Sequence, residues 1–375
     1  MLMALFEKGE LRNDILAFLE AAQQQGIYVV CVNTLKVADP QRYDQVIDCY
    51  IERYNFGRDF GSYKSGFQYL YQSGLAAQCP RMMLVNDSVF FSAKNNQGFI
   101  AEMFASPVEA LGATENYEIE HHLGSFCIAL SGNVLNNPRL KKYWKNYVCT
   151  DVRPVVIDTG EMELSKLLKK LVSTPDNFRA LYDMSRACEV IGKDPALLED
   201  VSSLARDSDL VHWPRFSFAS VADSVASKYL HSTTSMAGIS LDKAELENLH
   251  GIDIHFANSL SSFKQYVSST VVDGAARNDA LFPVLKEEVI ARFMACFAHG
   301  SQIHQNNIFL HRIGLPIIKL DGVFRGAFTT RDIERLAFDL EEAQRPEFRR
   351  IMYSRPYGGD VLFGWKRAAF FRGLI

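Results

Sequence analysis

Short apolar runs rich in β-branched residues alternate with helical patterns along the first 160 residues, and this alternation is the strongest constraint on the fold. Residues 27–32 (IYVVCV) and 81–91 (RMMLVNDSVFF) have the length and composition of buried strands. Residues 11–25 place leucine and isoleucine side chains on one helical face, and Gly26 follows as a stop signal. Buried strands separated by helices are typical of an α/β fold with a mostly parallel sheet.

The remaining pattern predicts a second, more helical part of the chain. Ser62 is a plausible N-cap for a helix. We expect helices over residues 138–147 and 161–172, short strands over residues 126–130 and 155–157, and mainly helix over residues 175–298. We therefore predict an α/β nucleotide-binding core over residues 1–172 and a mostly helical region over residues 173–375.

The overall charge argues against one class of partner. The chain has 40 Lys and Arg residues against 44 Asp and Glu residues, a net charge of −4. A nucleic-acid-binding protein needs a concentrated basic surface, so we predict no nucleic-acid partner. The seven cysteines are scattered and include no CxxC pair, which is typical of a reducing cytoplasm.

The last 31 residues depart from this balance. Residues 345–375 hold seven basic and two acidic side chains, and VLFGWKRAAFFRGLI interleaves cations with aromatic rings. This composition favours an interfacial helix on an anionic membrane. A terminal helix that packs its aromatic side chains onto the core is the alternative.

Three pieces of sequence suggest a binding site at one edge of the sheet. Residues 53–66 (RYNFGRDFGSYKSG) combine glycines with cations, a helix follows, and a buried strand then ends in Asn86-Asp87-Ser88. A carboxylate at the carboxyl end of a parallel strand points into the crevice where α/β sheets bind ligands.

The residue types in these pieces suit a nucleotide diphosphate. Glycines before a helix allow the backbone to approach a phosphate. Arg53, Arg58 and Lys64 carry the charge that would neutralise a diphosphate. Asp87 is a suitable ligand for Mg²⁺ or Mn²⁺ shared with that diphosphate. Taken singly, Asn55 and Gly57 are also ordinary turn residues, and Asp87 could simply cap the next element.

The same residues resemble a known family. RYNFGRDFGSYKSG followed by MLVNDSVFF is similar to the rhamnan synthesis protein F family, whose members show R-x-N-x-G-x-D-F-G-x-x-K-x-G and then a strand ending in N-D-S. HHLGSFCIAL, VIDTGEMELSKLL and GLPIIKL resemble later segments of that family. Gly124 and Phe126 stand where the family has Gln and Tyr.

The resemblance implies a GT-A-like, Rossmann-type nucleotide-sugar-binding sheet and an enzyme that transfers a sugar. The implied donor is dTDP-rhamnose-like, and the implied acceptor is a lipid-linked cell-surface polysaccharide. This places the protein in the cytoplasm, peripheral at the inner face of the plasma membrane. A glycosyltransferase-like module that binds a nucleotide-sugar or glycan without catalysis is the alternative.

The resemblance also assigns roles to individual residues. Glu161 and Asp87 are the catalytic candidates. Glu161 is the first candidate for the base that deprotonates the acceptor, and Glu118 and Glu120 are weaker candidates for that base. An acid that merely favours the first turn of a helix is the other interpretation of Glu161. The remaining candidates are, for the nucleotide-sugar, Arg53, Asn55, Gly57, Asp59, Lys64, Asn86, Asp87 and Ser88; for the acceptor, His122, Ser125 and Lys319; and for a divalent cation, Asp87 and His304.

Overall fold

The computed structural model describes residues 1–194, 197, 221, 261, 275–324, 327–354 and 362–371. Contacts divide the chain into one unit of residues 1–183 with 301–375 and another of residues 184–300. In the second unit, the helices α9 (Met184–Lys193) and α14 (Ala275–Phe297) contact each other. The predicted helical region over residues 175–298 otherwise lies mostly outside the described residues. The predicted boundary at residue 172 stays a prediction.

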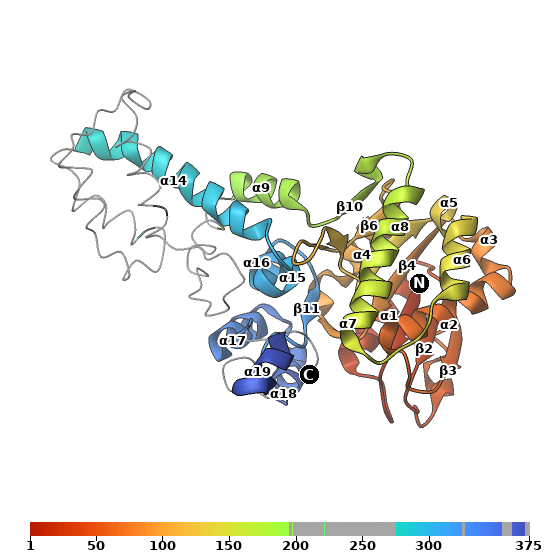
Figure 1. The fold of residues 1–375 in the computed structure, drawn as a ribbon. Coiled ribbons are helices and arrows are strands. Elements are labelled where there is room, and N and C mark those ends of the chain that lie inside the picture. The colour runs from red at the N-terminus through yellow and green to blue at the C-terminus, as the bar shows by residue number, and fades with distance from the viewer. Residues whose placement is uncertain are drawn as a thin grey trace. The chain divides into compact units, whose positions relative to one another are not determined.

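A seven-stranded sheet forms the centre of the first unit (Figure 1). The strand order is β10-β6-β9-β4-β1-β2-β3, and all neighbours pair in parallel except at β9. The predicted α/β fold class is therefore confirmed. The strands of this sheet are β1 (Leu2–Leu5), β2 (Val30–Asn33), β3 (Cys49–Glu52), β4 (Arg81–Asn86), β6 (Ala110–Gly112), β9 (Cys127–Ser131) and β10 (Phe178–Ala180).

Helices cover the sheet because its strands are apolar on both faces. The larger helices of the first unit are α1 (Asn13–Gln23), α2 (Arg58–Gln72), α4 (Asn96–Ala105), α6 (Pro138–Asn146), α8 (Glu163–Leu171), α17 (Thr330–Asp339), α18 (Arg345–Tyr353) and α19 (Gly364–Phe371). Short helices are α3 (Leu75–Gln78), α5 (Gly132–Leu135), α7 (Arg153–Val156), α15 (Gln302–Gln305), α16 (Asn307–Arg312), η1 (Pro40–Tyr43), η2 (Ala93–Asn95), η4 (Pro175–Asn177) and η6 (Glu342–Gln344).

The core on one face of the sheet is built around Trp144. Its ring stacks on Phe67 at 4.3 Å and lies 6.1 Å from Phe60, so α6 is fixed against α2. Leu2 and Ala4 of β1 contribute to the same core. Met3 and Leu5 are also buried and point to the opposite face, because successive strand residues alternate. On that side α1 contacts α4, and Phe18 stacks on Phe91 at 4.1 Å.

Two small sheets extend the site edge. Strand β5 (Val89–Phe91) leaves the line of β4 and pairs antiparallel with β11 (Ile317–Lys319), so that Lys319 lies opposite Val89. Strands β7 (Glu115–Asn116) and β8 (His122–Leu123) pair antiparallel. The β5–β11 pair brings a segment from far along the chain to the end of β4.

Two local predictions are wrong. Helix α2 begins at Arg58 after Gly57, whose φ of +86° suits glycine, so Ser62 lies inside the helix and is not its N-cap. Residues 155–157 are helical and not a strand. There Pro154 lies in the first turn of α7, which continues through the π-helical segment η3 (Ile157–Met162) into α8.

Candidate functional site

The candidate site lies where the strand order reverses. The chain passes from β1 outward to β2 and β3, and then returns to place β4 on the other side of β1. Ligands of open α/β sheets bind at the carboxyl ends of the strands beside such a reversal. At this edge β1 leads into Phe6 and Glu7, and β4 leads into Asp87 and Ser88.

A chain of hydrogen bonds joins three segments at this edge. Asn86 donates from Nδ2 to Oδ2 of Asp59 at 2.9 Å. Ser88 Oγ donates to Asn86 Oδ1 at 2.6 Å and accepts from Lys319 Nζ at 3.0 Å. Burial raises the pKa of Asp59, and the nearby carboxylate of Glu161 adds to this effect. Four predicted residues therefore lie in one hydrogen-bond network, although they are far apart in the sequence. They are Asp59, Asn86, Ser88 and Lys319.

A second group surrounds Glu161. Ser125 Oγ donates to Glu161 Oε1 at 2.9 Å, and His122 Nε2 lies 3.6 Å from Oε2. Burial alone would raise the pKa of Glu161, but His122, Ser125 and Lys319 outweigh it and lower that pKa. The carboxylate is therefore ionised at neutral pH, and its side chain keeps 26% exposure.

The contact of His122 with Glu120 indicates which ring nitrogen carries the hydrogen. Its Nδ1 lies 2.8 Å from the carbonyl oxygen of Glu120. Because a carbonyl only accepts, Nδ1 carries the hydrogen, and Nε2 faces Glu161.

Glu161 itself sits on an unusual backbone. It lies in the π-helical segment η3, which continues from α7, and not in the first turn of a helix. The alternative interpretation of Glu161, as an acid that favours a helix start, is therefore wrong. Gly160 packs so closely on Phe60 that an added Cβ would come within 2.9 Å of the ring. π-Helical turns are frequent at functional sites.

Lys319 connects the two groups. Its ammonium bonds Ser88, lies 4.8 Å from the ring centre of Phe126, and lowers the pKa of both Glu161 and Asp321. Of the candidates named from sequence, the structure brings together Asp59, Asn86, Ser88, His122, Ser125, Glu161 and Lys319.

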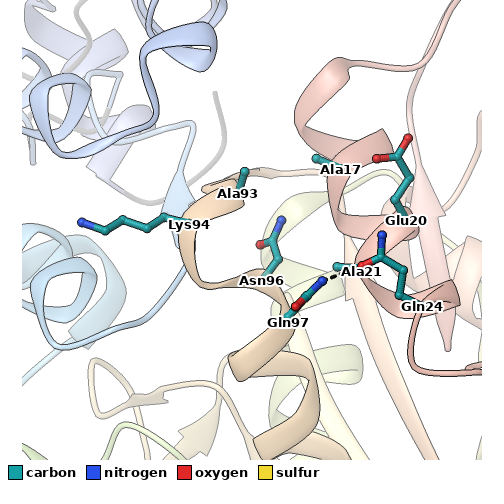
Figure 2. Close-up of a pocket in the computed structure, with 8 residues that line it drawn as sticks. All are labelled: Ala17, Glu20, Ala21, Gln24, Ala93, Lys94, Asn96 and Gln97. Atoms are coloured by element: carbon teal, nitrogen blue, oxygen red, sulfur yellow. Dashed lines mark hydrogen bonds between the residues drawn. The ribbon is translucent and has the colours of Figure 1, made fainter.

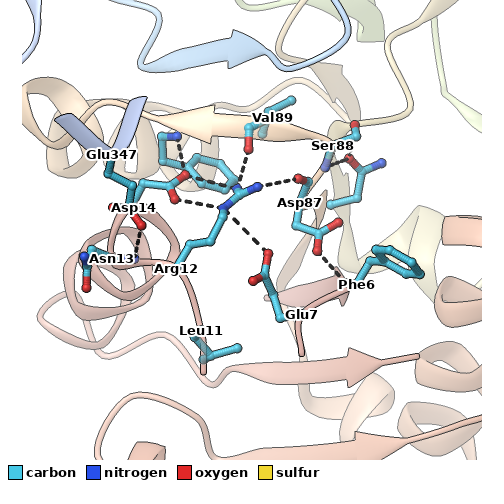
Figure 3. Close-up of polar contacts among 12 residues, drawn as sticks. Phe6, Glu7, Leu11, Arg12, Asn13, Asp14, Asp87, Ser88, Val89 and Glu347 are labelled. Carbon is cyan, nitrogen blue, oxygen red and sulfur yellow. Dashed lines mark hydrogen bonds and ion pairs between the residues drawn. The ribbon is translucent and has the colours of Figure 1, made fainter. Parts of the chain in front are cut away.

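Asp87 belongs to a neighbouring cluster centred on Arg12 (Figure 3). Arg12 donates to both carboxylate oxygens of Asp14, at 2.9 and 3.1 Å, and to the carbonyl oxygens of Asp87 and Val89. Glu7 lies 3.6 Å from Arg12 Nε. The Asp87 carboxylate accepts from the backbone N–H of Phe6.

Burial changes the protonation of this cluster. It raises the pKa of Glu7 to about 8 and that of Asp87 to about 6, although Arg12 opposes both shifts. Sequence reasoning missed Glu7, Arg12 and Asp14. Their position directly after the first strand was the available signal, because that strand ends at the same edge as β4.

Several predicted ligands have other tasks in the structure. Arg53 donates to Ser62 Oγ at 3.3 Å and to the carbonyl oxygen of Phe56. Lys64 donates to the carbonyl oxygen of Tyr147 at 2.6 Å, next to the end of α6. Asn55 is exposed. The charges of Arg53 and Lys64 therefore support the local fold.

The loop before α2 is held by Asp151. Its carboxylate accepts from the N–H of Gly57 at 2.7 Å, and its carbonyl oxygen accepts from Arg58 Nε at 3.0 Å. Arg58 has a φ of +51°, which is rare for a residue with a side chain. The glycine-rich segment is thus a fixed turn that presents the first turn of α2, including Asp59, to the site.

His304 is buried and engaged at both ring nitrogens. Nδ1 lies 2.7 Å from Ser301 Oγ, and Nε2 lies 2.9 Å from Asp321 Oδ1. Burial would raise the pKa of Asp321, but His304 and Lys319 lower it well below its usual range. No group of three or more His, Cys, Asp or Glu side chains among the described residues is arranged to hold a metal ion. A cation bound by Asp87 together with a diphosphate stays a prediction.

Comparison with known proteins agrees with the resemblance seen in the motifs. Residues 27–188 match the rhamnan synthesis protein F family. The chain is 25% identical over 217 residues to the uncharacterized protein y4gN of Sinorhizobium fredii, which covers 56% of each chain. It is 28% identical over 119 residues to the virulence protein VirA of Vibrio anguillarum, which covers 31% of this chain and 38% of that protein.

The matches therefore span about half or less of these relatives' own length. No solved structure matches the chain. No helix among the described residues is long and apolar enough to cross a membrane.

Proposed function

We propose that the chain is a glycosyltransferase, a proposal that starts from the match of residues 27–188 to the rhamnan synthesis protein F family. The proposed site is the carboxyl edge between β1 and β4, and the proposed core is GT-A-like. A mostly parallel sheet with polar residues gathered at this edge supports the assignment. We propose a dTDP-rhamnose-like donor and a lipid-linked polysaccharide acceptor at the inner face of the plasma membrane.

The arrangement around Glu161 carries this proposal. In the proposed reaction, the acceptor hydroxyl oxygen forms a bond to the anomeric carbon of the sugar. The bond from that carbon to the diphosphate oxygen breaks, and the nucleotide diphosphate leaves with the bonding electrons. The acceptor proton passes to the Glu161 carboxylate, which is ionised, partly exposed and fixed by Ser125.

His122 orients the proposed base. Glu120 fixes the tautomer of the imidazole, and the ring then holds Glu161 in one position. His122 is buried and lies behind the carboxylate, since its side chain is 2% exposed against 26% for Glu161. It therefore acts as a positioning residue in this proposal.

Lys319 and Asp87 are proposed to act on the diphosphate. Lys319 supplies a positive charge between Ser88 and the acids of the site. Asp87 would hold Mg²⁺ or Mn²⁺ together with the diphosphate, and such an ion would offset charge on the leaving group.

The test uses purified protein with dTDP-, UDP- and GDP-sugars, with and without Mg²⁺ or Mn²⁺. We expect release of nucleotide diphosphate, and we expect Glu161→Gln to lower the rate by about 10²- to 10⁴-fold. Glu163→Gln is the matched control, because Glu163 is an exposed acid two residues away that pairs with Lys166 at 3.1 Å. Full activity of Glu161→Gln would refute its assignment.

A binding module without catalysis is the second candidate. The internal use of Arg53 and Lys64 favours it, because fewer cations then face a diphosphate. A donor that raises the melting temperature but is not hydrolysed or transferred would support this candidate. Turnover that stops in Asp87→Ala would support the enzyme.

Exposed side chains at the start of α19 and just before it support a proposed contact with an anionic membrane. Phe363 is 79% exposed and Trp365 72% exposed, and Lys366 lies 6.0 Å from the Trp365 ring centre. Aromatic rings beside cations bind at the level of lipid headgroups. Vesicles with and without anionic lipid test this: Trp365→Ser should weaken binding to anionic vesicles, and unchanged binding would contradict the proposal.

A further inference from the structure

Two neighbouring loops expose apolar side chains beside the candidate site. Residues 53–57 join β3 to α2, and residues 147–152 join α6 to α7. Four of their side chains are apolar and at least half exposed, and we call them the loop patch: Tyr54, Phe56, Val148 and Val152. Tyr54 is 95% exposed and Val148 79% exposed. Apolar side chains gathered on a surface mark a contact with a protein or a membrane.

The backbone under the loop patch is anchored. Asp151 bonds the N–H of Gly57 and the side chain of Arg58, which ties the two loops together. Cys149 packs against Gly57 so closely that an added Cβ there would lie 2.7 Å from Cys149 Cβ. Lys64 fixes the chain just after α6 to α2. The two loops therefore hold their apolar side chains out at fixed, neighbouring positions.

Cations border the loop patch along α6. Residues 139–152 contain four basic side chains and one acidic side chain. All four cations are exposed: Arg139, Lys141, Lys142 and Lys145. Lys145 lies in the last turn of α6, three residues before Val148. The acid is Asp151, whose carboxylate accepts from Gly57. This surface thus joins apolar side chains to an excess of positive charge.

We propose that the loop patch and the cations of α6 contact the surface of an anionic lipid bilayer. Apolar side chains enter the headgroup region, and nearby Lys and Arg side chains attract anionic lipids. A stable interface between proteins takes about 20 to 30 residues on each side, many more than the loop patch offers. A bilayer requires no such area, because each inserted side chain and each nearby cation adds to the binding.

The position of the loop patch relates this contact to the candidate site. Residues 53–57 lead directly into the first turn of α2 with Asp59, and residues 147–152 lead through α7 to Glu161. A bilayer bound at the loop patch therefore lies beside these two acids. There it would present the hydroxyl group of a lipid-linked acceptor, and this last step alone rests on the proposed function.

Vesicle sedimentation with the purified full chain tests the contact. The vesicles contain phosphatidylcholine alone or phosphatidylcholine with phosphatidylglycerol, and we expect stronger binding to the second, anionic kind. Tyr54→Ser should weaken that binding about tenfold, because it removes an aromatic side chain that enters the bilayer. Lys145→Gln should weaken it about fivefold, which is the effect of one lysine at an anionic surface.

Two control variants carry the same substitutions on other surfaces. Tyr28→Ser removes a tyrosine that is 42% exposed and precedes β2, at the amino edge of the sheet. Lys94→Gln removes an exposed lysine at a pocket between α1 and α4, which lie on the opposite face of the sheet from α6. Figure 2 shows the Lys94 side chain extended away from α1. Both controls should bind anionic vesicles as the unaltered chain does.

The comparison between variants and controls decides the outcome. Weaker binding in Tyr54→Ser and in Lys145→Gln, with unchanged binding in both controls, supports the contact. Unchanged binding in Tyr54→Ser or in Lys145→Gln, or the same loss in all four variants, overturns it. Equal binding to neutral and anionic vesicles also overturns it. Self-association without lipid that Tyr54→Ser abolishes would assign the loop patch to a second copy of the chain instead.

Two further measurements separate this contact from the other proposals. In a Trp365→Ser chain the four variants should keep the same order of binding, because α19 is a different surface. Release of nucleotide diphosphate is measured without vesicles. Binding through the loop patch without any turnover would count against the proposed function and leave this inference standing. Turnover together with unchanged binding of Tyr54→Ser would do the reverse.

Discussion

Replacing Arg12 with methionine should lower the free energy of unfolding more than replacing one partner of an exposed ion pair does. Asp14 is completely buried, and Arg12 is 14% exposed and bonds both oxygens of that carboxylate. Removing one partner of a buried pair costs about 3 to 5 kcal/mol. The loss of stability has an upper limit, because the Asp14 carboxylate can take up a proton when Arg12 is absent. Protonating a carboxylate with the ordinary pKa of aspartate costs about 4 kcal/mol at pH 7 and about 1.5 kcal/mol at pH 5.

We therefore expect Arg12→Met to lower the free energy of unfolding by about 3 to 4 kcal/mol at pH 7 and by clearly less at pH 5. Urea unfolding at both pH values measures this. Arg349→Met is the control: Arg349 bonds Glu334 at 2.7 Å, but the two side chains are 40% and 49% exposed, so we expect about 0 to 1 kcal/mol. Equal losses in the two variants, or a loss at pH 5 as large as at pH 7, would refute the reasoning.

Three further predictions concern other parts of the first unit. The pKa of Glu7 is raised from 4.5 to about 8. Between pH 4.5 and about pH 8 the folded chain therefore keeps a proton that the unfolded chain loses. The free energy of unfolding should fall over this range by up to about 1.4 kcal/mol per pH unit. Unfolding of Glu7→Gln across this range should show a flatter profile, and an unchanged slope would count against a protonated Glu7. Gly57→Ala should lower the melting temperature more than Gly74→Ala does. Both glycines have a positive φ, but only at Gly57 would the new Cβ meet another residue, at 2.7 Å from Cys149 Cβ. Equal shifts of the melting temperature in the two variants would contradict this. If the proposed transfer occurs, Lys319→Met should move the acid limb of kcat/KM to higher pH, because the ammonium lowers the pKa of Glu161, and an unmoved limb would exclude that coupling.

Local patterns predicted the sheet well where an apolar run was clear. The run RMMLVN was predicted from its length and apolar composition, and all of its residues but Arg81 are buried. The helix before it buries Phe60, Tyr63, Phe67 and Leu70, as the 3.6-residue period requires. Residues 155–157 were assigned wrongly because a short β-branched run does not distinguish a strand from a buried helix. Pro154 in the first turn of α7 favours the helix that forms there.

The site was predicted unevenly for a related reason. Asn86, Asp87 and Ser88 were found because a buried strand ends there, and Glu161 because its segment resembles a family motif. Residue type alone did not tell which cations face the ligand, since Lys64 instead bonds the carbonyl oxygen of Tyr147, just after α6. Glu7 carries no motif. Only the strand order, which brings β1 beside β4, shows that it belongs to this edge.

The chain leaves the first unit after residue 183 and returns to it at residue 301, which bears on how the chain length between these points can change. Before this unit, the N–H of Tyr182 donates to the carbonyl oxygen of Ala113 at 3.2 Å; after it, Ser301 pairs with Asn116 in a β-bridge. The chain thus leaves the sheet-containing unit and re-enters it at neighbouring points of one short stretch. A long insertion at such a place can grow, shrink or be exchanged between relatives while the threading of the sheet stays the same.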